Sequence, residues 1–221
     1  MRIGIIIQAR NGSRRLPDKI NADIGGRTML WHVVNRAKGI VFPRPIPPIV
    51  ASPEFFECDE DNVLARYWLV AKRDALDAVM RITGDCPLLD PNACQRVLQA
   101  YQTGLYDYVA NDIFKTYPDG LGCEVFSFAA LEFAHQNATK PYDREHVTPF
   151  LKSHKEITKL NLRCPINGLS DLKLSVDTQE DLDFVREIDA AQPRDFSLAA
   201  TLEALERARP GHLATLGHGI P

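Results

Sequence analysis

A loop rich in basic residues follows the first apolar stretch of the chain. Its sequence, QARNGSRRLPDK, spans Gln8 to Lys19 and sets three arginines and a lysine among small residues such as Ala9, Gly12 and Ser13. Arginine forks and a lysine ammonium bind phosphate oxygens, which the backbone N–H groups of a turn can also cradle. No P-loop motif is present, because its Gly-Lys-Ser/Thr is missing. The loop predicts a phosphate site of another kind, although a solvated basic surface loop has the same composition.

Two aspartates stand where two expected strands end. Asp85 follows an apolar stretch in RITGDCPLLDP, and Asp177 follows an alternating one in LKLSVDTQEDL. The carboxyl ends of parallel strands meet at one edge of a sheet, so the two carboxylates would share that edge. Because Mg²⁺ usually takes one or two carboxylates together with phosphate oxygens, we expect a magnesium site there. The alternative is that Asp177 only starts a helix, a task that Thr178 can perform as N-cap.

A third group of polar residues could contact a second substrate. Asp119 lies in a turn sequence, YPDG, and Glu124 lies among apolar strand residues, where an unpaired carboxylate would be costly. In PYDREHVTPF, Arg144 could pair with Glu124 or with a substrate carboxylate, and His146 could form a hydrogen bond to substrate. A structural salt bridge and a core histidine would explain the same residues.

The apolar periodicity predicts strands alternating with helices. We expect strands over 2–8, 48–52, 77–83, 106–110, 122–128, 158–163 and 172–176, and helices over 29–40, 61–73, 91–103, 128–137, 143–153, from 178 onward and over 197–209. The glycine-rich tail, 212–221, is expected to be loose.

Alternation of this kind is typical of an α/β fold, with a mainly parallel sheet covered by helices on both faces. The 221 residues suit a single domain over 1–221, with a small irregular excursion at about 105–165. Only eight residues, 53–60, separate the second strand from the next helix, where a doubly wound domain normally places another helix and strand. Either the domain is contracted there or a stretch of sequence is missing.

Composition excludes several classes of partner. The 26 basic and 29 acidic residues give a formal charge of −3, which offers no global attraction for nucleic acid or an anionic membrane. No apolar run approaches a membrane span, and the N-terminal run is too short for a signal peptide. The five cysteines lack paired metal-ligand spacing and read as reduced thiols. We expect a cytoplasmic protein.

Several motifs, taken together, resemble the cytidylyltransferase family that activates 3-deoxy-manno-octulosonate and acylneuraminates. They are IIIQARNGSRRLPDK, GGRTMLWHVVNRA, DNVLARY, RITGDCPLLDP, YPDGL with EVFS, DREHVTP and VDTQEDL. Their order matches the branch called spore coat polysaccharide biosynthesis protein F, and they cover the chain to about Ile188. The resemblance implies a nucleotide-diphospho-sugar transferase-like fold, Mg²⁺-dependent nucleotidyl transfer from CTP, and a homodimer paired through the irregular middle region.

The resemblance also implies roles for individual residues. Gly122 departs from the family, which often has aspartate there, at a position that bears on acceptor choice. The family also has more sequence at the connection over 53–60, a region that could supply base or ribose contacts. The implied roles are Arg10, Ser13 and Lys19 for the triphosphate, Arg81 near the nucleotide, and Asp85 and Asp177 for Mg²⁺. From the residues themselves we add Gln8, Ala9 and Gly12 as nucleotide-binding candidates and expect Arg10, Lys19 and Asp85 to be catalytic. The resemblance is less explicit about the acceptor, for which our candidates are Asp119, Glu124, Arg144 and His146.

We therefore expect a cytidylyltransferase that couples CTP to a sugar or sugar acid for surface polysaccharide biosynthesis and releases pyrophosphate. Two other functions fit the same residues. A glycosyltransferase could bind a ready-made nucleotide sugar and use Gly84-Asp85-Cys86 as its metal motif. A catalytically silent homologue could bind nucleotide without turning it over.

Overall fold

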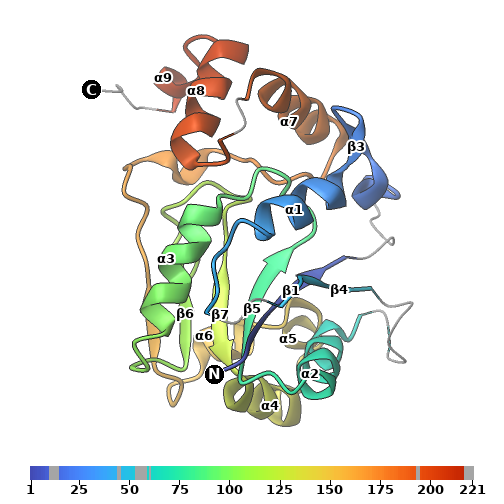
Figure 1. Ribbon diagram of the computed structural model, residues 1–221, viewed down its shortest axis with the longest axis vertical. Helices are drawn as coiled ribbons and strands as arrows, with labels where there is room; N and C mark the ends of the chain where they lie inside the picture. The colour runs from blue at the N-terminus through green and yellow to red at the C-terminus, as the bar shows by residue number, and fades with distance from the viewer. Residues whose placement is uncertain (10–14, 44–45, 53–58, 60, 193–194, 217–221) are drawn as a thin grey trace.

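One six-stranded sheet forms the centre of the molecule, seen in Figure 1. The computed structural model describes residues 1–9, 15–43, 46–52, 59, 61–192 and 195–216. The strand order is β4-β1-β5-β7-β6-β8, and a small hairpin, β2-β3, lies apart from the sheet. The strands are β1 (Ile3–Gln8), β2 (Asp23–Ile24), β3 (Arg27–Thr28), β4 (Ile49–Ala51), β5 (Ala78–Thr83), β6 (Tyr108–Ala110), β7 (Glu124–Ser127) and β8 (Lys159–Asn161).

The sheet is mainly parallel, as predicted. Strand β1 pairs in parallel with β4 and β5, and β6 pairs in parallel with β8. Strand β7 runs antiparallel to both β5 and β6, and it sets Glu124 opposite Arg81. One antiparallel strand in the middle of the sheet thus pairs an acidic and a basic residue across two strands.

Helices cover both faces of the sheet, which confirms the predicted α/β architecture (Figure 1). On β1, Ile5 and Ile7 join the core cluster under α1 and α3, whereas Ile6 joins the cluster under α2 and α4, because strand side chains alternate between faces. The helices are α1 (Met29–Ala37), α2 (Val63–Arg73), α3 (Pro91–Tyr101), α4 (Phe128–Asn137), α5 (Pro141–His146), α6 (Pro149–Ser153), α7 (Gln179–Ala191), α8 (Leu198–Ala208) and α9 (His212–Thr215).

The predicted strand over 172–176 is wrong. A 3-10 helix, η3 (Leu169–Asp171), precedes a segment that makes a single parallel bridge, between Lys173 and Asp119. The N–H groups of Leu174 and Val176 donate to the carbonyls of Asp119 and Asp85. Both acceptors lie in loops, so these hydrogen bonds do not join the segment to a strand of the main sheet. Asp177 therefore follows a bridge segment and not a strand of the main sheet. The Thr178 N-cap is confirmed, as part of a capping box.

Two other expectations need correction. The helix predicted over 143–153 is broken into α5 and α6, because Val147 has a φ of 70° and Pro149 cannot continue the hydrogen-bond ladder. The tail is not loose throughout, since α9 buries Leu213 in the core; residues 217–221 lie outside the described part. The shortened connection at 53–58 and 60 also lies outside the described residues.

The stretch at about 105–165, which we expected to be an irregular excursion, contributes strands to the main sheet. It supplies β6, β7 and β8 together with α4, α5 and α6. Its separate role in acceptor binding and dimerisation stays a prediction. Among the helices that the structure describes, none has the length and apolar character needed to cross a bilayer.

Gly120 allows the 172–176 segment to approach the turn before β7. Its φ is 100°, and a Cβ atom there would lie 2.6 Å from the backbone of Leu174 and Ser175. We predict that Gly120→Ala lowers the free energy of unfolding by about 3 kcal/mol, through strain and a backbone clash, as measured by urea denaturation. Gly104→Ala is the matched control, because Gly104 has a φ of 75° but open space around it; equal losses for both variants would contradict the clash.

Candidate functional site

Three segments that are distant in sequence meet at the carboxyl ends of β1 and β5. The N–H of Gly84 donates to the carbonyl of Gln8 at 2.8 Å, and the N–H of Val176 donates to the carbonyl of Asp85 at 2.9 Å. A Cβ atom at Gly84 would lie 2.7 Å from the Gln8 oxygen, so this approach requires glycine. These backbone contacts bring Asp85 and the residue after Val176, Asp177, to one place.

The ammonium group of Lys19 joins these segments. The side chain, 11% exposed, starts from a 3-10 helix, η1 (Lys19–Asn21). Its Nζ lies 3.0 Å from Asp85 Oδ2, 3.2 Å from Asp177 Oδ1 and 2.8 Å from the carbonyl of Val176. A lysine ammonium has three N–H donors, and each has one acceptor here. Lys19 thus places one positive charge between two carboxylates.

Further cations surround Asp177. Arg15 Nη2 lies 3.0 Å from Asp177 Oδ1, and Lys173 Nζ lies 3.3 Å from Asp177 Oδ2. Partial burial acts to raise the pKa of Asp177, but Lys19 and Lys173 outweigh it and hold that pKa below its ordinary value. The carboxylate is therefore ionised at neutral pH, and its cation Lys173 is shared with a third carboxylate, Asp181, at 2.5 Å.

The donor set fits a magnesium ion that is completed by phosphate. The part of the chain that the structure describes has no group of three or more His, Cys, Asp or Glu side chains suited to a metal. Two carboxylates nevertheless converge on one cationic group, and Mg²⁺ commonly takes one or two protein carboxylates and completes its shell with phosphates and water. Asp85 and Asp177 are thus brought together as predicted, and the metal itself stays a prediction.

The predicted phosphate loop is described only at its two ends. Gln8 ends β1 and Ala9 is buried beside it, whereas Arg10, Gly12 and Ser13 lie outside the described residues. Lys19, at the far end of the loop, is the predicted nucleotide-binding residue that the structure places against both aspartates.

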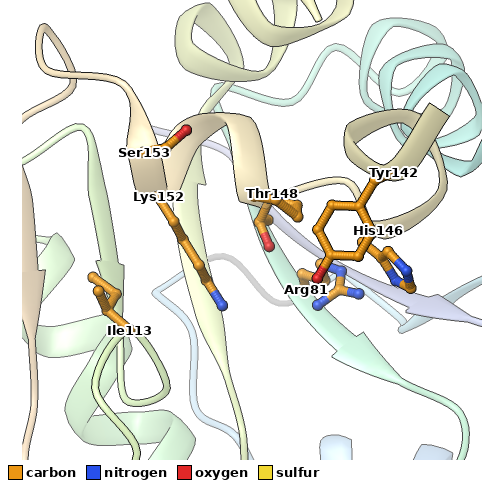
Figure 2. A pocket seen from close by; sticks show the side chains of 8 residues that line it. Arg81, Ile113, Tyr142, His146, Thr148, Lys152 and Ser153 are labelled. Carbon is orange, nitrogen blue, oxygen red and sulfur yellow. The ribbon is translucent and has the colours of Figure 1, made fainter. Parts of the chain in front are cut away.

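A cavity of about 470 Å³ opens near the carboxyl-terminal half of β5. In Figure 2, Tyr142, His146 and Arg81 lie on one side and Lys152 on the other, with Thr148 between them. The rings of Tyr142 and His146 are 4.4 Å apart between centroids. The lining residues are Arg81, Ile113, Tyr142, His146, Thr148, Pro149, Lys152 and Ser153.

A buried carboxylate holds the charged residues of this cavity. Glu124, 1% exposed, lies 2.7 Å from Arg81 Nη1 and 2.8 Å from Lys152 Nζ, and it accepts hydrogen bonds from Tyr108 and Thr148. Burial alone would raise its pKa, but Arg81 and Lys152 lower it to about 2. Arg81 Nη2 also donates to Gln8 Oε1 at 3.3 Å. The cavity is thereby connected to the strand that leads into the phosphate loop.

A second carboxylate, Asp112, shares Lys152 with Glu124. Asp112 Oδ2 lies 3.0 Å from Lys152 Nζ, and Asp112 Oδ1 is buried without a hydrogen-bond donor. Burial and the neighbouring Glu124 raise the pKa of Asp112 to about 6, against the opposing effect of Lys152. Two cations and two carboxylates therefore form one network at the cavity.

The predicted acceptor residues do not all meet. His146 lines the cavity, and Glu124 lies beneath it, but the partner of Glu124 is Arg81, which was expected near the nucleotide. Arg144 Nε instead donates to the carbonyl of Ala138. The exposed Asp119 forms a bridge with Lys173, in the segment that leads to Asp177, and so lies away from the other predicted acceptor residues.

Sequence reasoning missed Asp112 and Lys152. Lys152 falls two residues after the quoted PYDREHVTPF motif, and Asp112 falls two residues after β6. Neither has a motif of its own, and only the pairing of β7 with β6 and β5 brings Asp112, Glu124 and Arg81 together.

We predict that Glu124→Gln lowers the free energy of unfolding at pH 7 by about 3 kcal/mol, because Arg81 and Lys152 lose their buried counter-charge. The pKa of Glu124 is depressed from 4.5 to about 2, so its stabilisation is complete above pH 4.5 and is lost as the pH falls towards 2. Urea denaturation at pH 7 and pH 3 should show the gap between wild type and variant shrinking. Glu203→Gln, on the exposed face of α8, should leave stability unchanged; a gap for Glu124→Gln that is independent of pH would contradict the assignment.

Comparison with known proteins identifies the family. Residues 4–43 and 49–213 match the family described as cytidylyltransferase. An uncharacterized protein of Methanocaldococcus jannaschii is 30% identical over 226 residues, covering 89% of this chain and 90% of that protein. The spore coat polysaccharide biosynthesis protein SpsF of Bacillus subtilis is 27% identical over 228 residues, covering 91% and 93%.

The fold agrees with that match. A solved cytidylyltransferase from Leptospira borgpetersenii superposes with a TM-score of 0.85 at 25% identity, covering 100% of this chain and 99% of that one. The architecture is that of the nucleotide-diphospho-sugar transferases, as predicted. From its sequence match and its fold, this chain belongs to the cytidylyltransferase family.

Proposed function

We propose that this protein transfers CMP from CTP to a hydroxyl group of a sugar or sugar acid, releases pyrophosphate, and serves surface polysaccharide biosynthesis in the cytoplasm. The observation that carries the proposal is Lys19, held between Asp85 and Asp177 at the end of a basic loop. Family membership supports CTP as the nucleotide, and the relationship to SpsF supports a polysaccharide pathway.

The nucleotide side of the site supplies charge for a triphosphate. Lys19 and Arg15 lie where the loop from Gln8 returns to the aspartates, so their charges attract phosphate oxygens. The exposed Arg15 can bind phosphate directly, whereas Lys19 would exchange one of its three present acceptors for a phosphate oxygen. When bound to Asp85 and Asp177, Mg²⁺ would neutralise charge on the phosphates and on the leaving pyrophosphate. These residues then hold the triphosphate in a fixed position.

The acceptor side of the site is the cavity lined by Arg81, His146 and Lys152. In the proposed reaction, the acceptor oxygen bonds to the α-phosphorus and the bond from that phosphorus to the α,β-bridging oxygen breaks. Pyrophosphate leaves with the bridging oxygen, and the proton of the acceptor hydroxyl goes to water. The contact between Arg81 and Gln8 couples the cavity to the strand that enters the phosphate loop. Catalysis then comes mainly from positioning the two substrates and stabilising charge.

We predict that Asp85→Asn slows CTP-dependent pyrophosphate release by about 10²-fold, roughly 2.7 kcal/mol in the barrier, because Lys19 and the metal lose a shared carboxylate. Release is measured across a panel of sugars and sugar acids with each of the four nucleoside triphosphates. Asp171→Asn, an exposed aspartate in η3, should keep the wild-type rate. An unchanged rate for Asp85→Asn would remove Asp85 from the mechanism. Release of a nucleoside mono- or diphosphate from a nucleotide sugar would instead favour glycosyl transfer.

The proposed enzyme is a homodimer that pairs through its middle region. Exposed large apolar side chains support this, because Leu105, Phe114, Tyr142 and Ile166 all fall between residues 105 and 166. Such side chains, where they cluster, often mark protein interfaces.

We predict a sedimentation mass of twice the 24.8 kDa chain mass. Phe114→Ser should shift the equilibrium towards monomer by weakening an apolar contact. Val41→Ser is the control, since Val41 is equally exposed but lies outside the middle region. A wild-type protein that sediments as a monomer would refute the pairing.

A further inference from the structure

We infer that the cavity at Arg81 and Lys152 selects an uncharged, hydroxyl-rich acceptor over a sugar acid, and that Asp112 sets this preference. The inference rests on the proposed function, because it names the acceptor class for the same site. It concerns binding selectivity, which can be measured without turnover.

The first step of the argument is the charge balance at the cavity. Among the described residues that line it, Arg81 and Lys152 carry permanent positive charge. Arg81 is paired with Glu124 at 2.7 Å, and Lys152 is paired with Asp112 at 3.0 Å as well as with Glu124 at 2.8 Å. Two positive charges thus face two negative ones, so the lining residues that the structure describes offer no surplus permanent cation to an incoming carboxylate.

The second step is the cost of adding a third carboxylate. In a partly buried site, an anion beside this network is repelled by Glu124 and Asp112 about as strongly as Arg81 and Lys152 attract it. The anion would also lose its hydration on entering the cavity. A neutral sugar avoids the repulsion, and its desolvation costs less.

The third step concerns the uncharged polar side chains of the cavity. Tyr142, His146, Thr148 and Ser153 line it beside the two cations. Hydroxyl groups both donate and accept hydrogen bonds, so the hydroxyl groups of a sugar can pair with these side chains in either direction. An ionised carboxylate only accepts, so it can use only their donors.

Asp112 is the carboxylate of this network with the fewer protein partners. Glu124 already has four partners in Arg81, Lys152, Tyr108 and Thr148, whereas Asp112 has an ion pair only to Lys152 among the described side chains. Asp112 directly precedes Ile113 in the cavity wall. On its other side, a Cβ atom at Gly122 would lie 3.5 Å from Asp112 Oδ2, so the backbone at Gly122 lies close to this carboxylate.

The test uses sugar acids, among them 3-deoxy-manno-octulosonate, N-acetylneuraminate and glucuronate, each paired with its uncharged carboxamide. Affinity is measured by calorimetry in the presence of CTP and Mg²⁺. We expect the wild type to bind at least one carboxamide at least tenfold more tightly than its acid. Preference for an acid in any pair, or failure to bind every carboxamide, would overturn the inference.

Two substitutions of opposite sign test the role of charge. Asp112→Asn removes one negative charge and should shift the acid-to-amide affinity ratio at least tenfold towards the acid. Lys152→Gln removes one positive charge and should shift the ratio the other way. Asp183→Asn, on the exposed face of α7, makes the same charge change far from the cavity lining and should leave the ratio unchanged. Shifts of the same sign for both cavity variants would refute electrostatic selection by Asp112.

Pyrophosphate release from the same mixtures separates the two proposals. Release with a preference for acids would preserve the proposed function and refute the inferred selectivity. Preferential binding of carboxamides without release from any acceptor would do the reverse.

Discussion

The contacts of Lys19 with Asp85 and Asp177 form the constraint on which the proposed nucleotide site depends. Two carboxylates held close together repel each other, and the ammonium between them offsets that repulsion while the carbonyl of Val176 takes its third N–H. The backbone hydrogen bond between Val176 and Asp85 holds the same geometry independently of charge. Charge and backbone together place groups from three distant parts of the chain at one edge of the sheet.

A second ionic group organises the neighbouring cavity in a different way. The antiparallel register of β5 and β7 sets Arg81 opposite Glu124, so the fold itself aligns this pair. Replacing Glu124 would leave Arg81 buried without a carboxylate partner, whereas replacing Arg81 would leave Glu124 paired with Lys152 alone. Because Arg81 also contacts Gln8, the cavity and the loop that follows β1 are joined through the neighbouring strands β1 and β5.

The two ionic groups differ in their exposure. Around Asp177, the cations Lys19, Arg15 and Lys173 meet the carboxylates of Asp85, Asp177 and Asp181, and the side chain of Arg15 is 66% exposed. Around Glu124, which is 1% exposed, two cations meet two carboxylates. Under the proposed function, the exposed cation at the first group suits an anionic triphosphate, and the buried, balanced charges at the second suit hydroxyl groups.

The sequence by itself determined the alternation of strands and helices, the basic loop that ends at Lys19, and the family, since these depend on local periodicity and on ordered motifs. It also indicated that Asp85 and Asp177 would meet, although it did so through a strand over 172–176 that does not form. Only the tertiary structure decided that Glu124 pairs with Arg81 and not Arg144, and that Asp112 and Lys152 join them. The physical reason is that the partners in a buried ion pair are decided by strand register and by helix packing between distant segments. Neither the register nor the packing can be read from the spacing of residues along the chain.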